Sequence, residues 1–333
     1  MSKNMTIENM EKDFYLTANE TNKELAEEYL DNATHLSDKS LEQYRSALKI
    51  FLSYVNSFCG NKNITDMTSL EFKKYLNWLL KQGLFSAAIR LKKSAVSNLN
   101  NNILLFHETE YPTFRNFTVG IKPPETGKKN IKEPITDDEY AKLCKYLEEK
   151  ESWQKLAYIK FSYDSGARRN EVRAVFKEVV NYEPLIKTVK VRDKEGKEMI
   201  LPVKKYKTQP IKCKGKKSAE LRKLSFNEDT LYYMKKWLEV RGEDNCPYMF
   251  VTPAKDGYNQ VAETTFNSWC EEFSKFLGRR VYPHLFRSSR ATSLYLSGKT
   301  MDSIKGLLGH KSVETTQIYV VKNDTDEDDA IYT

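Results

Sequence analysis

A histidine and a tyrosine near the end of the sequence, His310 and Tyr319, are the first residues whose types and spacing suit shared chemistry. The stretch before them predicts a buried helical face, because three apolar residues follow the i, i+3, i+4 spacing: Ile304, Leu307 and Leu308. Gly309 follows where a helix stop is expected, and Ser312 is suited to cap a short second helix. Since the chain holds 20 Tyr and most tyrosines pack in cores, Tyr319 becomes a candidate nucleophile only through the residues upstream.

Two arginines upstream each lie in a motif with a second polar group. In Ser165-Gly-Ala-Arg168-Arg-Asn-Glu171 a glycine beside a helix start places Arg168 at a turn, where Glu171 can pair with its guanidinium. In His284-Leu-Phe-Arg287 the i, i+3 spacing places both side chains on one helical face, directed at one point. Taken singly, each motif is more typical of a structural role, a surface arginine pair with an ion pair in the first and a capping histidine with a surface arginine in the second.

A third motif, Lys212-Cys-Lys214-Gly-Lys-Lys217, is a basic tip between two predicted strands, from which one lysine can reach into a groove. Arginine, lysine, histidine and tyrosine together suit phosphoryl transfer. Arginines bind the non-bridging oxygens of a phosphodiester with fixed geometry, and a lysine can protonate the departing 5′ oxygen. Histidine can accept the tyrosine proton or bind the phosphate, and a phenol of pKa ~10 needs such neighbours. A phosphotyrosine bond conserves the energy for rejoining, so we expect no metal and no nucleotide cofactor.

Composition limits the class of protein. The chain has 333 residues, 40% of them hydrophobic and 30% charged, as expected of a soluble two-domain protein. We find no run of about 18 apolar residues and no signal peptide, and so expect no membrane partner. Five scattered Cys without a C-x-x-C pair and only four His favour a reducing compartment and argue against a zinc site.

The net charge of +8 is unevenly distributed. Residues 1–40 carry four Lys against nine acids, whereas residues 186–223 carry fourteen Lys or Arg against four acids. A basic block interleaved with β-type residues predicts a polyanion partner, nucleic acid first. A solvated hairpin is the alternative interpretation of this block alone.

Periodic apolar residues predict mostly helices. Residues 1–38 are polar and acidic, and we expect an extension with one short helix at about 22–32. Apolar residues at helical spacing predict three amphipathic helices in this region. The first covers 44–58, the second begins at a capping box, Thr68-Ser-Leu-Glu71, and the third covers 86–105. A second capping box, Thr136-Asp-Asp-Glu139, opens a further helix, and 153–165 predicts a buried one. Strands are expected over 186–191, 199–203 and 221–226, and helices at about 228–240, 262–277, 284–297 and 300–308.

These elements predict a mainly α protein with a small antiparallel β-sheet. We expect an acidic extension (1–38), a helical domain (39–121), a Pro- and Gly-containing linker (122–133), a second domain (134–322) and an acidic tail (323–333).

In this order the motifs resemble the tyrosine recombinase, or phage integrase, family over residues 37–322. Gly166-Ala-Arg168-Arg-Asn-Glu171 matches the family's first-arginine motif, and His284-Leu-Phe-Arg287 its His-x-x-Arg motif. Leu308-Gly-His310 and Tyr319 match the Leu-Gly-His motif and the nucleophile. The family's hairpin lysine best matches Lys214, with Lys212, Lys216 and Lys217 close by. Ser288 stands where the family often has a second histidine, which puts a structural contact in doubt, and 192–220 is longer than a minimal hairpin.

The resemblance implies a two-domain DNA clamp, made of a SAM-like core-binding domain and a catalytic domain. It implies site-specific strand exchange through a 3′-phosphotyrosyl intermediate and a Holliday junction, by a homotetramer on two double-stranded sites. Off DNA we expect a monomer or a weakly associated oligomer, in the cytoplasm, and an accessory directionality factor is a further candidate partner. Integration and excision of a mobile element are favoured over dimer resolution of the Xer type. The basic residues expected to contact DNA are Arg90, Lys92, Lys93, Lys128, Lys129, Lys212, Lys216 and Lys217.

Three other functions compete with recombination. A type IB topoisomerase uses the same tyrosine chemistry, but the Leu-Gly-His motif and the helical N-terminal domain favour a recombinase. A catalytically silent DNA-binding protein would be free to lose members of the set, which is intact here. A helical RNA-binding protein would carry an aromatic RNA-binding signature, which we do not find.

Overall fold

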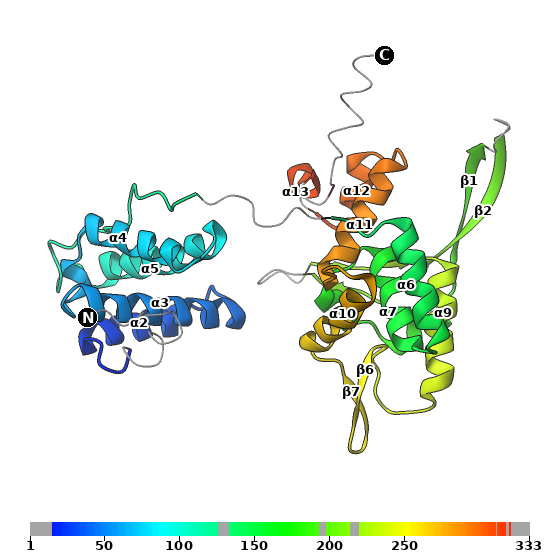
Figure 1. Cartoon of the computed structure of the whole chain (residues 1–333), viewed down its shortest axis with the longest axis horizontal. Coiled ribbons are helices and arrows are strands. Elements are labelled where there is room, and N and C mark those ends of the chain that lie inside the picture. The colour runs from blue at the N-terminus through cyan, green and yellow to red at the C-terminus, as the bar shows by residue number, and fades with distance from the viewer. Residues whose placement is uncertain are drawn as a thin grey trace, which may run out of the picture. The chain divides into compact units, whose positions relative to one another are not determined.

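The computed structural model divides the chain into two units, Met1–Ile131 and Lys132–Thr333 (Figure 1). It describes residues 15–125, 133–192, 198–213, 220–310, 312–317 and 320. Most of the predicted linker and the whole acidic tail lie outside the described residues. Among the helices of the described part, none combines the length and the apolarity needed to cross a membrane.

The first unit is helical. Its described helices are α2 (Glu20–Asn32), α3 (Asp38–Phe58), the 3-10 turn η2 (Ile64–Asp66), α4 (Ser69–Lys81) and α5 (Ser86–Phe106). The capping box predicted at Thr68 and Glu71 is confirmed at the start of α4. Aromatic rings from α3 and α4 meet in the core, where Phe51 lies 6.2 Å from Phe72 and 5.1 Å from Tyr75, measured between ring centroids.

Helix α2 corrects the prediction of an acidic extension over residues 1–38. Leu25, Tyr29 and Leu30 are buried in the core of the first unit, so the described part of this segment belongs to the helical unit itself. Asn22 is buried as well, and its side chain bonds to the backbone at Lys62 and Ile64. The acidic composition hid this role, because the acids occupy the outer face of an amphipathic helix whose inner face is apolar.

The second unit builds its helices around α7. The described helices are α6 (Asp137–Glu149), α7 (Trp153–Ser165), α8 (Arg169–Arg173), the 3-10 turn η3 (Lys177–Asn181), α9 (Glu228–Arg241), α10 (Glu263–Leu277), α11 (Pro283–Leu296), α12 (Met301–Leu308) and α13 (Val313–Gln317). Helix α7 packs against α6, α9 and α11 and is buried on nearly all sides, as the sequence predicted. The capping box at Thr136 and Glu139 is confirmed at the start of α6.

The described residues of this unit also form three small antiparallel sheets. The strands are β1 (Leu185–Arg192), β2 (Glu198–Lys207), β3 (Ile211–Lys212), β4 (Leu221–Arg222), β5 (Ser225–Phe226), β6 (Val251–Ala254) and β7 (Gly257–Gln260). They pair in the orders β1-β2-β5, β3-β4 and β6-β7. The single strand predicted over 221–226 is thus two strands with different partners. The β6-β7 hairpin was missed, although Asp256-Gly257 is a hairpin turn signal.

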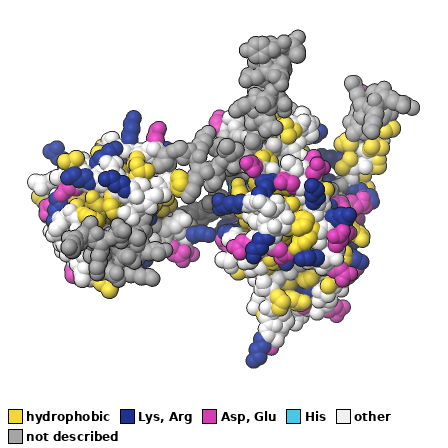
Figure 2. Space-filling model, in the orientation of Figure 1, with side chains coloured by type: hydrophobic (Ala, Val, Ile, Leu, Met, Phe, Trp, Pro, Cys, Tyr) yellow, Lys and Arg dark blue, Asp and Glu magenta, His cyan; other side chains and the backbone are white. Residues whose placement is uncertain are grey.

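The β1-β2 hairpin projects from the body of the second unit (Figure 1). Its side chains are largely exposed, including the apolar Ile186 and Ile200, each at 64%. Figure 2 shows these hydrophobic side chains as a column along the hairpin. Only the inner end of β2 joins the core, where Tyr206 pairs with Phe226 of β5.

Candidate active site

Two left-handed glycine turns bring the predicted motifs together. Helix α7 ends at Gly166 (φ 57°) and α12 ends at Gly309 (φ 63°), a conformation that side chains with a Cβ adopt with strain. The turns pack against each other so closely that a Cβ on Gly166 would lie 2.7 Å from Cδ2 of Leu308. Arg168 follows the first turn and His310 follows the second. The packing of the two turns therefore determines how the Arg168 and His310 segments lie relative to each other.

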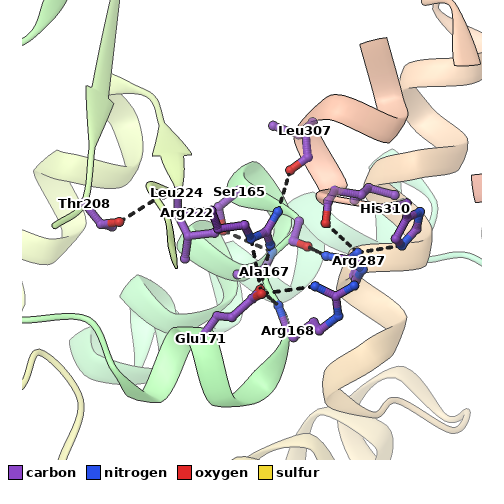
Figure 3. A network of polar contacts seen from close by, with 12 residues as sticks. Ser165, Ala167, Arg168, Glu171, Thr208, Arg222, Leu224, Arg287, Leu307 and His310 are labelled. Atoms are coloured by element: carbon purple, nitrogen blue, oxygen red, sulfur yellow. Dashed lines mark hydrogen bonds and ion pairs between the residues drawn. The ribbon is translucent and has the colours of Figure 1, made fainter. Parts of the chain in front are cut away.

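Arg287, on α11, joins both turns (Figure 3). Its Nη1 donates to the carbonyl oxygen of Gly166 at 2.5 Å, and its Nη2 donates to that of Leu308 at 2.7 Å. Nη2 also lies 2.6 Å from Nε2 of His310. Arg287 is completely buried, and its guanidinium contacts three groups from two segments that are far apart in the sequence.

Glu171 orients Arg168, as the sequence predicted. One carboxylate oxygen accepts from Nη1 of Arg168 at 3.1 Å, and the other accepts from the backbone N–H of Arg168 at 2.6 Å. Burial of Glu171 opposes its ionisation, but hydrogen bonds from Arg222 and from the Arg168 backbone hold the pKa of this carboxyl below its usual value. A buried carboxylate that stays charged is a fixed anchor for the arginines around it.

Arg222 is part of the same cluster, and the sequence interpretation missed it. Its Nη2 lies 2.6 Å from Oε2 of Glu171, and its Nη1 donates to the carbonyl oxygen of Leu307 at 3.0 Å. The signal was available in the alternation of the segment: Leu224 and Phe226 are buried, and Arg222 stands in register with them. An arginine at an inward position of a strand predicts a buried partner.

His310 is held at both ring nitrogens. Arginine can only donate, so Nε2 accepts from Arg287, and the ring proton lies on Nδ1, which is 3.0 Å from Oγ1 of the buried Thr316. Burial, followed by the charges of Arg287, Arg168 and Arg222, lowers the pKa of His310 to about 4. His310 is therefore neutral at physiological pH.

This neutral histidine should make stability depend on pH. In the unfolded chain His310 takes up a proton near its ordinary pKa of about 6.5. Between about pH 6.5 and 4 the unfolded state then binds more protons than the folded one, so acid favours unfolding and stability rises with pH across this window. We expect urea unfolding from about pH 7.5 to 4 to show this loss in the wild type and a flatter profile in His310→Gln. Equal slopes in both proteins would contradict a buried neutral His310.

A basic cleft opens beside the cluster. It has a volume of about 920 Å³, and Arg168 and His310 are among its lining residues. Further cationic side chains line it: Lys205, Lys207, Arg222, Lys223, Arg290 and Lys299. Burial, followed by the charges of Lys207 and Lys187, lowers the pKa of Lys205. The walls thus combine positive charge with the polar groups of the cluster, as suits a polyanionic ligand.

The remaining predicted residues are placed as follows. His284 is half-buried on α11, one turn before Arg287. Lys212 is exposed on β3. Three further residues, on α5 of the first unit, are partly or fully exposed: Arg90, Lys92 and Lys93. The rest lie outside the described residues: Lys128, Lys129, Lys214, Lys216, Lys217 and Tyr319.

Ser288, where the resemblance placed a structural contact in doubt, is buried on α11 beside Arg287. Its hydroxyl donates to the carbonyl oxygen of His284 at 3.4 Å, within the helix. The neighbouring Ser289 accepts from the backbone N–H of Ile135 and so ties α11 to the start of the second unit. This serine pair therefore serves the packing of α11.

Family models and known proteins agree with this fold. The model described as "Phage integrase family" matches residues 133–326, and that described as "Phage integrase, N-terminal SAM-like domain" matches residues 27–101. The SPbeta prophage-derived recombinase-like protein YomM of Bacillus subtilis (strain 168) is 30% identical over 305 residues, covering 89% of this chain and 86% of that protein. Tyrosine recombinase XerA of Pyrococcus horikoshii is 25% identical over 281 residues, covering 82% of this chain and 87% of that protein.

Solved structures share the architecture at low identity. The Tn1549 transposon integrase in complex with transposon right end DNA gives a TM-score of 0.65 at 13% identity, covering 93% of this chain and 98% of that one. The XerH recombinase bound to a difH substrate gives 0.64 at 16% identity, covering 98% and 93%. The predicted fold class, mainly α with small antiparallel sheets and a helical domain before a catalytic one, is confirmed. The chain belongs to the phage integrase family of tyrosine recombinases, whose members are DNA strand-transferring enzymes.

Proposed function

We propose that this chain is a site-specific recombinase of double-stranded DNA that breaks and rejoins strands through a covalent bond between Tyr319 and a 3′ phosphate. One observation carries the proposal. Arg287 bonds directly to His310, and Arg168 is linked through Glu171 and Arg222 to the turn before His310. This network lies at the edge of a basic cleft that Arg168 and His310 both line. The residues on either side of Tyr319 support it, since Thr316 bonds to His310 and Val320 packs against Ile304 and Leu308.

Each candidate residue has a separate role in the proposed reaction. The phenol oxygen of Tyr319 bonds to phosphorus as the bond from phosphorus to the 5′ oxygen breaks, and the 5′ oxygen takes a proton from a lysine of the 212–217 loop, Lys214 first. Arg168, which lines the cleft, stabilises the charge on the non-bridging oxygens. Both ring nitrogens of His310 already make hydrogen bonds. His284, which lies on α11 one turn before Arg287, is therefore the better base for the phenol proton. The free 5′ hydroxyl of a second strand then reverses these steps.

Mobile-element integration and excision are the biological role that we favour. A relative described as prophage-derived is 30% identical over 89% of the chain, which supports this role. Relatives of the XerA type at 25% identity support dimer resolution as the second candidate. A tetramer on two sites, an accessory directionality factor and action in the cytoplasm belong to the same proposal and rest on the family resemblance.

The experiment that tests the function needs no known site. The protein is incubated with randomised duplexes that carry a nick to trap the leaving strand, with a chelator and without nucleotide. DNA that becomes covalently attached to protein is then sequenced. We expect an adduct at a reproducible sequence. Specific DNA binding without any adduct would favour the catalytically silent DNA-binding protein instead.

Binding should weaken steeply with salt. A cleft lined by seven Lys and Arg is expected to neutralise several phosphates, and each contact releases bound counterions. With about six phosphate contacts, affinity should fall roughly a thousandfold between about 50 and 200 mM salt. Titration of a labelled duplex at several salt concentrations measures the slope. A flat response would contradict an electrostatic DNA-binding cleft.

A further inference from the structure

Arg222 connects the β3-β4 hairpin to the candidate active site. It lies on β4 opposite Ile211 of β3, and the pairing continues to Cys213 and Glu220, where the backbone N–H of Cys213 donates to the carbonyl oxygen of Glu220. Three of the four candidate lysines belong to residues 214–219, which lie outside the described residues. The Arg222 side chain is only 14% exposed, so it is directed inward from the hairpin.

The guanidinium of Arg222 contacts two parts of the cluster at once (Figure 3). Nη2 and Nε lie 2.6 Å and 3.2 Å from the two carboxylate oxygens of Glu171, a bidentate pair. Glu171 also holds Arg168, so one buried carboxylate is shared by two arginines. Nη1 donates to the carbonyl oxygen of Leu307, in the last turn of α12 before His310.

The turn before His310 is shaped around this side chain. A Cβ on Gly309 would lie 2.6 Å from Nη1 of Arg222 and 3.2 Å from its Cδ. The left-handed φ of 63° and this close approach both favour glycine at the position. The Arg222 side chain therefore occupies the space that a Cβ on Gly309 would need, and it packs against the residue directly before His310.

We propose that Arg222 is a positioning residue for strand cleavage, which docks the β3-β4 hairpin onto the Arg168-Glu171 pair and the turn before His310. The inference rests on the proposed function, because it assigns Arg222 to the same reaction. All the contacts of Arg222 described above are to protein groups, so it acts through Arg168 and His310. Loss of Arg222 should lower the rate of adduct formation more than the affinity for DNA, because the cleft keeps its other cationic side chains.

A matched pair elsewhere in the second unit separates positioning from stability. Arg279 donates from Nε and Nη2 to the two oxygens of Glu139 at 2.7 and 2.6 Å, and also to the carbonyl oxygens of Glu133 and Pro134. The pair has the same chemistry as Arg222 with Glu171, and Arg279 is not among the residues that line the cleft. Arg279→Ala therefore controls for the general loss of a bidentate ion pair.

The test compares wild type, Arg222→Ala, Arg222→Lys and Arg279→Ala on the captured site, below the melting temperature of each variant. We expect Arg222→Ala to lower the single-turnover rate of adduct formation about a hundredfold, the size typical of a lost active-site contact, with Kd within about threefold. Arg222→Lys keeps the charge but cannot reach Glu171 and Leu307 together, so its rate should be intermediate. Arg279→Ala should lower Tm and leave the rate within about threefold.

A second readout is the titration of His310 by NMR, which is tractable because the chain has four His. The charge of Arg222 contributes to the lowered pKa of His310, after burial, Arg287 and Arg168. Arg222→Ala should raise the titration midpoint, and Arg279→Ala should leave it in place. The shift would show that Arg222 acts on His310 in the folded protein, and a purely structural pair would leave the rate at saturating DNA unchanged.

The outcomes are distinct. Rates for Arg222→Ala within threefold of Arg279→Ala would overturn the positioning role while the proposed function stands. If Arg222→Ala does not fold, Arg222→Lys decides, and a wild-type rate for it overturns the inference. Absence of an adduct with wild-type protein would overturn the proposed function, and the inference would fall with it.

Discussion

Tyr319→Phe is expected to abolish the covalent adduct, lowering its rate of formation by at least about a thousandfold, the scale seen when a catalytic nucleophile is removed. The change deletes one oxygen and no charge, so DNA binding should stay within about threefold of wild type. The loss is large because no other group would stand in line with the phosphate, and phenylalanine cannot form the bond that conserves the phosphodiester energy.

The measurement is single-turnover capture on nicked duplexes, with Tyr232→Phe as the matched control. Tyr232 lies on α9, is 57% exposed and is not among the residues that line the cleft, so its change should leave the rate intact. An adduct from Tyr319→Phe would place the nucleophile at another tyrosine. Loss of DNA binding together with cleavage would show instead that Tyr319 serves folding or the DNA interface.

Local patterns in the sequence were sufficient for much of this site. The capping boxes at Thr68 and Thr136 and the helix stops at Gly166 and Gly309 depend on neighbouring residues only. The pairing of Glu171 with Arg168 likewise joins residues three apart in sequence. Where partner and residue lie within one turn, the spacing determines the contact.

The same local patterns could not predict contacts between residues that are far apart in the sequence. Arg222 and Glu171 are 51 residues apart, so an alternation that places Arg222 on an inward face cannot identify its partner. The acceptors of Arg287 are backbone carbonyls 121 and 21 residues away, and any residue type supplies a carbonyl. The sequence therefore indicated that Arg287 belongs to the site, but it could not indicate that the side chain is enclosed.

The complete burial of Arg287 is the basis of the second prediction with a large expected effect. Arg287→Ala is expected to slow adduct formation about a hundredfold to a thousandfold, the range for loss of a preorganised donor, while Kd for DNA changes less than about threefold. Arg287 is not among the residues that line the cleft, so few phosphate contacts are lost with it. The chemistry should suffer because His310 loses the donor at Nε2 and the two glycine turns lose their common link.

The same variant should also lose stability, at about 1–3 kcal/mol for each buried carbonyl left without a donor. Arg241→Ala is the control, because Arg241 is also buried and also donates to backbone carbonyls, those of Tyr248 and Cys246, away from the cleft. Both variants should melt at lower temperature, and only Arg287→Ala should lose the adduct when both are assayed folded. If Arg241→Ala slowed cleavage equally, stability alone would explain the effect. If Arg287→Ala lost binding and cleavage in equal measure, Arg287 would be a folding residue.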